Sequence, residues 1–596
     1  MRWDCPSTSL SRAFPLRGNS LSVMNVRGKR IFNYRPVCLF ALALASGIIV
    51  TEALHSFSHL LRLVFLGAGV AVFVTMLCLR RSRKFSYIAI AFIVGIISAS
   101  AASDLFDARS PQTYNGTFTA RVESEIVVSG GKATFTVGSV YVDGSVYVDG
   151  SELYGCGKVT LYTDGEISFG VGDTVMLKGR IEPVGHDPFD TYFASDVLSG
   201  RYFEAGAESV EKLADGKPGF PLNVRTAVSK LFYEHTDYDT ASIAQALLLG
   251  DKDGIDFSLY DNIQASGLAH ALAVSGLHVT ALASFVYFLL KKLKVPPILA
   301  FAAMSVVTFL YVAICSFSPS ALRAFIMTAA LNFASAFGLK KDSLSSLALA
   351  ASLIMLFSPF SLMHVGFLLS VFAILGIFLF TEPLTSLFMR GVNKIAPSVA
   401  YSAHTAVPTS GTAALMSGNV SYDRTGRATR ITVYDSATGK ASVVKEKLFR
   451  RVLIRVSESC AVALAANFAT FPLVAYFFGE VQTLFILSNV IILPYVMFIY
   501  TLLLIITPFA LITALHGLVG IFDWLLVPFK AFVKAVGAVS FASVPVSVSV
   551  TFIVCFTVCM LTVSRFVFLK RRTKALCVIA VCAVGLVVGS LASLAA

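Results

Sequence analysis

Charged residues are scarce in this sequence. They make up 14% of the 596 residues, whereas hydrophobic residues make up 56%. Soluble domains average about 25% charged residues, so this composition excludes a single soluble globular domain. The apolar residues come in blocks about 20 residues long, each sufficient to cross a bilayer as a helix. The composition therefore predicts a polytopic α-helical membrane protein in contact with the lipid bilayer.

Motifs for metals and nucleotides are also missing. The ten cysteines form no C-x-x-C pair or other metal-spaced cluster, and most lie in or beside apolar blocks, where cysteine behaves as a small hydrophobe. No Gly-x-x-x-x-Gly-Lys-Ser/Thr loop is present, so the chain is not expected to supply ATP-driven force. We expect no metal, no cofactor and no enzymatic activity.

The basic residues are placed as membrane topology requires. The net charge of +13 could indicate nucleic acid, but most basic side chains flank apolar blocks, as the positive-inside rule predicts. Residues 1–36 carry seven basic residues against one acid, so we expect a cytoplasmic leader and no cleaved signal peptide. Three spans should follow in residues 37–104, and the chain should then emerge outside the cell.

Residues 105–205 change character to short alternating runs rich in β-branched and aromatic residues. Asp-Gly pairs at Asp143, Asp149 and Asp164 are typical of hairpin turns. Five or six such strands predict an inserted, extracellular all-β domain, which we interpret as an OB-like barrel. Residues 206–262 contain two amphipathic stretches, 224–232 and 241–249, which we expect to lie at the membrane interface or against the barrel.

Apolar blocks resume in residues 263–403, the first part of the membrane core, and in residues 448–596, the second part. A polar segment at 404–447 separates them and should be a cytoplasmic loop with little packed core. The second part includes a span expected at 509–528. Counting every block gives roughly 13 spans, with the N terminus inside and the C terminus outside.

The run Gly267–Thr280 places His270, Ser275, Gly276 and His278 inside an apolar block. Polar side chains at membrane depth usually face a protein interior or a wet path. Ser275-Gly276 favours a helix break, as in the interrupted helices of transporters. The alternative is close helix packing with both histidines satisfied. The histidines are eight residues apart, which does not match the i,i+4 pairs of metal sites.

Three further polar positions interrupt the core. Arg323, one turn after Ser320 in its block, either anchors the helix by reaching outward or faces inward and offers a cation to an anionic substrate. Asn467 and Asn489 are each followed five residues later by proline, which suggests two broken helices. Their alternative role is hydrogen bonding between helices.

These segments together carry a family resemblance. The run His270–Val279 resembles the signature of the ComEC-type competence proteins, which are membrane channels for imported single-stranded DNA. The likeness covers about residues 37–510 and includes these pieces: Leu248–Asp251, Ser318–Ala324, Gly366–Ser370, Asn467–Pro472, Asn489–Pro494, Gly172–Arg180 and Phe189–Phe193.

The resemblance implies a role in natural transformation at the cytoplasmic membrane of a bacterium. It also implies an outer-surface DNA receptor and a cytoplasmic ATP-driven motor as partners. Longer relatives end in a metallo-β-lactamase-like domain. This sequence has no His-x-His-x-Asp-His motif, so we expect a short form without a nuclease.

Charge separates two places where DNA could be bound. Residues 107–204 hold 14 acids and 7 bases, a net charge of −7. Grooves for single-stranded nucleic acid usually combine basic side chains with stacking aromatics. A local stripe of that kind could still be built from Lys158, Tyr162, Lys178, Arg180, Tyr192, Phe193 and Arg201. We expect DNA contact in the membrane core rather than on the barrel. Two rival functions remain open: secondary transport of a small anion, and a non-transport membrane scaffold.

Overall fold

The computed structural model describes the chain apart from residues 1–35, 54–63, 66, 73–74, 76–85, 125, 130–131, 143–150, 163–167, 186–190, 199, 253, 273, 339–341, 396–416, 423–427, 435–440, 444–447, 512, 564–572 and 582–596. The described residues are mostly helical. Six helices are long and apolar enough to cross a membrane: α1 (Pro36–Ala53), α3 (Ser86–Arg109), α10 (Pro297–Ile314), α13 (Val365–Ile395), α15 (Leu448–Phe478) and α16 (Phe485–Ala510). Helices suit hydrocarbon because each segment pairs its own backbone groups. The predicted class, a helical membrane protein, is confirmed.

Further helices of the described part are α9 (Gly276–Lys292), α11 (Pro319–Ala336), α12 (Ser343–Phe357) and α18 (Val550–Val563). The predicted count of about 13 spans stays a prediction, because several of the expected blocks fall partly outside the described residues. Residues 1–35 of the predicted basic leader also lie outside them.

The span expected at 509–528 is wrong as a single helix. The chain leaves α16 at Ala510, passes through η3 (Thr513–Gly520) and enters α17 (Ile521–Gly537). Gly517 and Gly520 lower helix propensity at this bend. α17 buries Phe522, Leu526 and Phe529 on one face. Its position is therefore explained by this amphipathic pattern and not by its overall hydrophobicity, on which the predicted span was based.

The two helices expected to break at proline are continuous. α15 runs through Pro472 and α16 runs through Pro494 without a gap. Membrane helices tolerate proline when nearby groups satisfy the carbonyls that it frees. The described hydrogen bond of Asn467 also stays within its own helix, where Nδ2 donates to the Ala463 carbonyl of α15 (3.1 Å).

The β domain is a closed barrel. Its strands are β1 (Tyr114–Val122), β2 (Val127–Ser129), β3 (Lys132–Val142), β4 (Ser151–Tyr162), β5 (Thr174–Pro183) and β6 (Arg201–Ala214). They pair in the order β1-β5-β6-β4-β3-β2, and an additional pairing of β1 with β3 closes the ring. All pairs are antiparallel except β4 with β6. Alternate residues point inward, which is why Val175, Leu177 and Ile181 of β5 are buried while Lys178 is exposed.

The barrel extends past the boundary predicted at residue 205, because β6 continues to Ala214. The second half of β6 carries Glu208 and Glu211, which are both exposed. These charged residues obscured the alternation of apolar and polar residues that would have predicted a strand. α4 (Thr191–Leu198) precedes β6.

One carboxylate joins the ends of β5 and β6. Asp173 Oδ2 accepts hydrogen bonds from the Gly170 amide (2.8 Å) and Lys212 Nζ (2.7 Å), and Oδ1 accepts one from the Gly216 amide (3.0 Å). The Lys212 bond is the largest cause, followed by the backbone donors, of a pKa of Asp173 lowered to about 2.

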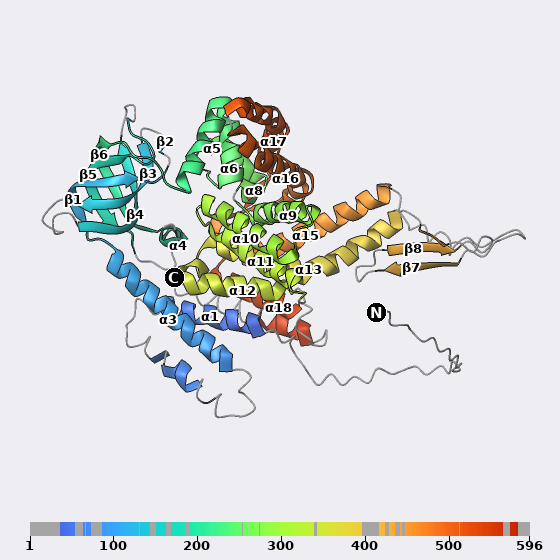
Figure 1. Cartoon of the computed structure of the whole chain (residues 1–596). Coiled ribbons are helices and arrows are strands. Elements are labelled where there is room, and N and C mark those ends of the chain that lie inside the picture. The colour runs from blue at the N-terminus through green and yellow to red at the C-terminus, as the bar shows by residue number, and fades with distance from the viewer. Residues whose placement is uncertain are drawn as a thin grey trace, which may run out of the picture.

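The segment after the barrel is helical, and its expected position at the membrane interface stays a prediction. It forms α5 (Leu222–His235), α6 (Tyr238–Leu249), α7 (Phe257–Ala265) and α8 (Ala269–Leu272), and every residue of α6 from Thr240 to Leu249 is buried. These helices pack with α16, η3 and α17 (Figure 1). α6 is covered on all sides although it carries Thr240, Ser242 and Gln245, so it is a core helix of this cluster.

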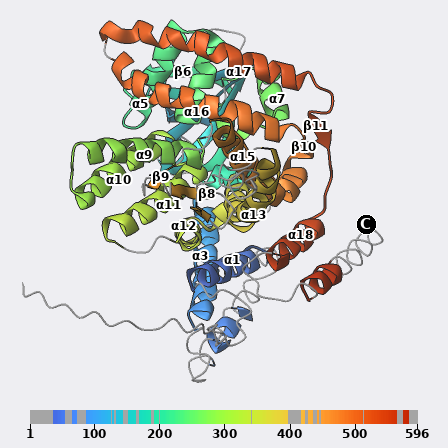
Figure 2. The same cartoon turned by 90° about the vertical axis from the view of Figure 1, so that its right-hand side faces the viewer.

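The segment predicted as a polar loop contains a small sheet. β7 (Ser417–Tyr422), β8 (Ala428–Tyr434) and β9 (Ala441–Val443) pair antiparallel in that order, between α13 and α15. This sheet and the barrel lie at opposite ends of the molecule (Figure 1). A third sheet pairs β10 (Glu480–Gln482) with β11 (Ser543–Pro545), which ties the start of α16 to the connection between α17 and α18 (Figure 2).

The α13–α15 pair gives a test of membrane-core packing. A Cβ at Gly376 of α13 would collide with the Ala465 carbonyl and lie 2.5 Å from the Ala469 Cβ, whereas one at Gly391 of the same helix meets nothing within 4 Å. Gly376→Ala should lower stability by about 1–3 kcal/mol through overpacking. Gly391→Ala should raise stability by up to about 1 kcal/mol, because alanine is the better helix former. Thermal unfolding of the purified full-length variants in detergent measures both, and equal effects would contradict the close packing.

The lowered pKa of Asp173 predicts a pH dependence of barrel stability. The carboxylate stabilises the fold fully above its unfolded pKa of about 3.9, and this contribution is lost as pH falls through about 2. Asp173→Asn should therefore make the barrel more susceptible to proteolysis at pH 7 and flatten the loss of stability between about pH 4 and pH 2. Limited proteolysis at neutral pH and circular dichroism across the acid range check the two parts. An unchanged acid profile in the variant would argue against the role of Asp173.

Candidate functional site

The helix break at Ser275-Gly276 lies at the centre of the candidate site. The chain turns at Gly267, which has φ +74°, makes the four-residue helix α8, and becomes extended at Ser275 before α9 begins at Gly276. Gly276 leaves space for α11, since a Cβ there would lie 3.4 Å from the Ala324 Cβ. The structure therefore brings the Ser275-Gly276 break next to the turn of α11 that carries Arg323.

His278 supports the start of α9. Its side chain is 1% exposed, and its Nδ1 accepts a hydrogen bond from the Ser275 backbone amide (3.3 Å). This is one half of a capping box, with histidine in the place of the usual acid or amide. An accepting Nδ1 requires the neutral ring with its proton on Nε2. In this structure His278 stabilises the break instead of facing an open path.

Two buried tyrosines hold the His278 turn in place. The ring of Tyr500 lies over that of His278, with centroids 4.2 Å apart. The Tyr500 hydroxyl is 3.2 Å from the His278 carbonyl and 3.1 Å from the Tyr311 hydroxyl, which donates to the Leu248 carbonyl (3.1 Å). This chain of bonds joins α16, α9, α10 and the end of α6. A buried hydrogen-bonded network of this kind favours one arrangement of the helices.

His270 differs from His278 because its side chain is exposed. Its Nδ1 lies 2.9 Å from the Gly267 carbonyl, which can only accept, so Nδ1 carries the proton and Nε2 is left for another partner. A Cβ at Gly267 would lie 3.3 Å from the Phe485 Cβ, which places α8 against the first turn of α16. Asn489 follows one turn later on α16, half-buried, and its Oδ1 has no hydrogen-bond partner among the described residues.

Arg323 is buried, with 1% of its surface exposed, which removes the outward-reaching alternative. Its Nε donates to the Ser370 hydroxyl (3.2 Å) and its Nη2 to the Gly366 carbonyl (2.9 Å), both on α13. The guanidinium carbon lies 5.0 Å from the centre of the Phe367 ring. Within the described part of the chain, Arg323 forms no salt bridge and its Nη1 finds no hydrogen-bond partner. A buried cation without a counter-ion is costly, and a bound anion would offset that cost.

The remaining core candidates are spread around this cluster. Ser320, half-buried, lies in the first turn of α11, whose N-cap is Ser318. Asn467 lies on α15, and its described hydrogen bond stays within that helix. The cluster thus contains the break, Ser320 and Arg323, with Asn489 on the neighbouring α16, while Asn467 stands apart from it.

The barrel does not assemble the basic stripe that the sequence allowed. Phe193 is 1% exposed and packs inside the protein, so it cannot stack on a base. Arg180 pairs with Glu182 (2.8 Å) and Arg201 pairs with Asp196 (3.2 Å). Lys178 is exposed on β5, but Lys158 lies on β4 beside Glu204 of the intervening strand β6. The side chains of Tyr162 and Tyr192 lie outside the described residues.

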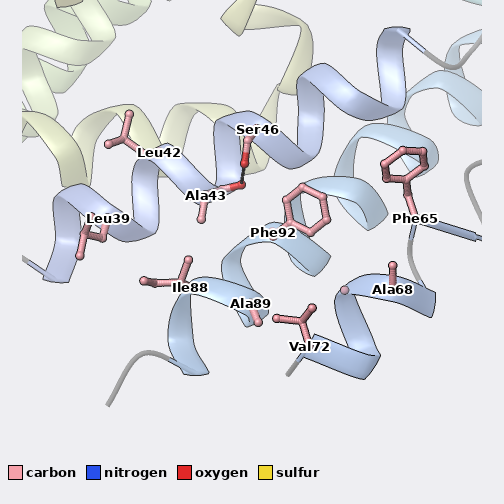
Figure 3. A pocket seen from close by; sticks show the side chains of 11 residues that line it. Leu39, Leu42, Ala43, Ser46, Phe65, Ala68, Val72, Ile88, Ala89 and Phe92 are labelled. Atoms are coloured by element: carbon pink, nitrogen blue, oxygen red, sulfur yellow. Dashed lines mark hydrogen bonds between the residues drawn. The ribbon is translucent and has the colours of Figure 1, made fainter. Parts of the chain in front are cut away.

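An apolar cavity of about 550 Å³ lies elsewhere, between α1, α3 and the helical residues 64–72 (Figure 3). Ser46 is its one polar lining side chain, and the Ser46 hydroxyl is already bonded to the Ala43 carbonyl (2.8 Å). The cavity is separate from Arg323 and has no charge with which to recognise an anion.

Comparison with known proteins identifies the family. A family model described as "Competence protein" matches residues 247–572, more than half of the chain and the whole of the cluster described above. The chain belongs to the competence protein family. It is a multi-pass membrane protein.

Similarity to individual proteins is more limited. The chain is 30% identical over 132 residues to ComE operon protein 3 of Bacillus subtilis (strain 168), a match that covers 22% of this chain and 17% of that protein. No solved structure matches the chain.

Several residues of this competence protein's site were not among the sequence candidates. Gly366 and Ser370 bind Arg323, and their i,i+4 spacing on one face of α13 was a usable signal. Tyr311 and Tyr500 gave no signal, because both read as ordinary apolar-block residues and they are 189 positions apart.

The role of His278 as a cap can be tested by stability. His278→Phe keeps the ring beside Tyr500 but removes the Nδ1 acceptor, so it should lower the free energy of unfolding by about 1 kcal/mol. His270→Phe, at an exposed side chain, should change stability less. Thermal unfolding of both full-length variants provides the comparison. A larger loss for His270→Phe would assign the cap elsewhere.

Proposed function

We propose that this protein is a channel that passes single-stranded DNA inward across the cytoplasmic membrane of a bacterium during natural transformation. The single observation that carries the proposal is Arg323, a buried guanidinium with one N–H face unpaired among the described residues, beside a helix break. Family membership and the resemblance of the His270–Val279 run support the same function.

The chemistry of this cluster suits a phosphodiester chain. Guanidinium groups bind phosphate oxygens strongly, and Nη1 of Arg323 is the group left for such an oxygen. Further hydrogen bonds along the path would come from these groups: His270, Ser275, Gly276, Ser320 and Asn489. His278 would stabilise the helix break without contacting the strand. Conduction needs sites that also release the strand, so one cation with several neutral groups fits better than a dense basic groove.

The barrel and the topology complete the proposal. A small barrel of five strands in a ring, with one parallel pair, supports an OB-like domain. We place it outside the cell, with the N terminus inside, the C terminus outside and about 13 spans in all. An outer-surface DNA receptor would deliver the strand and a cytoplasmic ATP-driven motor would pull it.

Arg323→Met tests the function directly. An apolar residue of similar length in place of a buried charge is often neutral or stabilising, so the variant should fold and insert normally. Its uptake of labelled DNA into the cytosol should fall at least about tenfold, as expected when a charged hydrogen bond worth about 1.5–3 kcal/mol is lost. DNA bound at the cell surface should not change.

A matched control is Arg450→Met. Arg450 is 4% exposed and donates from Nη1 and Nη2 to Asn393 Oδ1 (both 3.1 Å), so its contacts join α15 to α13. Uptake in this control should fall only as far as its membrane level falls. Normal cytosolic uptake in Arg323→Met would remove Arg323 from the path. Loss of uptake of a small anion, with transformation intact, would identify a transporter.

A further inference from the structure

Three aromatic rings from distant parts of the chain meet where the barrel joins the membrane core. Phe106 comes from the end of α3, Phe193 from α4 of the β domain, and Phe360 from η2 (Pro359–Leu362) between α12 and α13. The Phe193 ring stands edge-on to Phe106 and to Phe360, with centroid distances of 5.0 Å and 5.3 Å. All three rings are at most 3% exposed. Edge-to-face pairs of this kind have a preferred geometry and are not interchangeable with aliphatic contacts.

The barrel is attached firmly to this aromatic junction. Tyr202 of β6 stacks on Phe106 with centroids 5.4 Å apart, and its hydroxyl accepts a hydrogen bond from Arg109 Nη1 (3.2 Å). Arg201, the preceding residue, forms a salt bridge to Asp196 of α4 (3.2 Å). These contacts join strand β6, helix α4 and the end of α3, and so they fix the position of Phe193.

η2 depends on its neighbours for its position. It is a four-residue 3₁₀ helix between Ser358 and Met363, and such short helices have weak intrinsic geometry. Pro359, Phe360 and Ser361 are all buried, and η2 packs against α3, α4 and α12. The aromatic junction is thus one of the contacts that sets where the chain enters α13.

A short hydrogen-bonded path leads from Phe360 to Arg323. The Met363 amide donates to the Phe360 carbonyl (3.0 Å), the His364 amide to the Ser361 carbonyl (3.2 Å), and the Leu368 amide to the His364 carbonyl (3.1 Å). Gly366 lies within this turn, and its carbonyl accepts a hydrogen bond from Nη2 of Arg323. A Cβ at Gly366 would lie 3.0 Å from Cε1 of His364, so the His364 ring packs directly on this turn.

We infer that the β domain positions Arg323: Phe193 and Phe106 hold Phe360, and Phe360 holds the start of α13 that binds the guanidinium. Phe193 and Phe360 are positioning residues, since they act through Gly366 and Ser370 and touch no substrate. The importance of this coupling for DNA uptake rests on the proposed function, while the coupling itself rests on the contacts above. It gives the acidic barrel a role that does not require it to bind DNA.

Hydrogen–deuterium exchange of the purified full-length protein tests the coupling without DNA. In Phe193→Ala, amides of residues 358–368 should exchange about tenfold faster, because two edge-to-face contacts are lost. The matched control is Phe135→Ala, at a residue that is 2% exposed and packs on Phe169 inside the barrel (5.2 Å). It should speed exchange in the barrel and leave residues 358–368 unchanged. Phe193→Leu, which keeps the apolar volume, serves if Phe193→Ala does not accumulate.

Cytosolic DNA uptake, measured in the same variants, separates the two levels of the inference. Faster exchange at residues 358–368 together with reduced uptake in the Phe193 variants supports both levels. Faster exchange with full uptake supports the coupling and counts against a role of Arg323 in transport. Unchanged exchange in the Phe193 variants, or the same change in Phe135→Ala, overturns the coupling.

Discussion

In the apolar interior of a membrane protein, every polar group must find its partner within the protein, and this constraint shapes the site. At the break before α9, the Ser275 amide has no helical partner and is met by His278. At the start of α11, the Arg323 side chain is held by a carbonyl and a hydroxyl of α13. The first contact is local, whereas the second joins α11 to residues of α13 that are 43 and 47 positions away, so the start of α11 depends on α13 being in place.

The same constraint explains how support and chemistry are divided within the cluster. Tyr311 and Tyr500 use their hydroxyls on each other and on backbone carbonyls, and His278 uses Nδ1 on the Ser275 amide, so these groups support the helices. Arg323 and His270 keep a ring or guanidinium nitrogen that no described residue uses. A rigid frame with a few open donors is the arrangement that a binding site on a membrane path needs.

Much of the fold could be read from the sequence, and the limits have physical causes. Alternation and turn residues predicted the β domain as far as residue 205, but glutamates on the solvent face of β6 concealed its continuation. The Ser-Gly pair marked the break in the helix because those residues favour helix starts. The same residues could not show that the His278 side chain would be buried and the His270 side chain exposed. The break separates the two histidines into different helices, so their spacing along one continuous helix does not predict which way each points. The ring contacts of Phe193 were equally hidden, since stacking on a base and packing in a core call for the same residue.

The hydrogen bonds between Arg450 and Asn393 also bear on how this family can diversify. They join α13 and α15 close to where the two helices meet the segment that connects them, and the helices pack against each other along their length. The pair is thus closed by its own contacts, and the entropic cost of a longer connection rises only slowly with its length. Insertions between the two helices can accumulate, shrink or be replaced over evolution without altering the packing around Arg323.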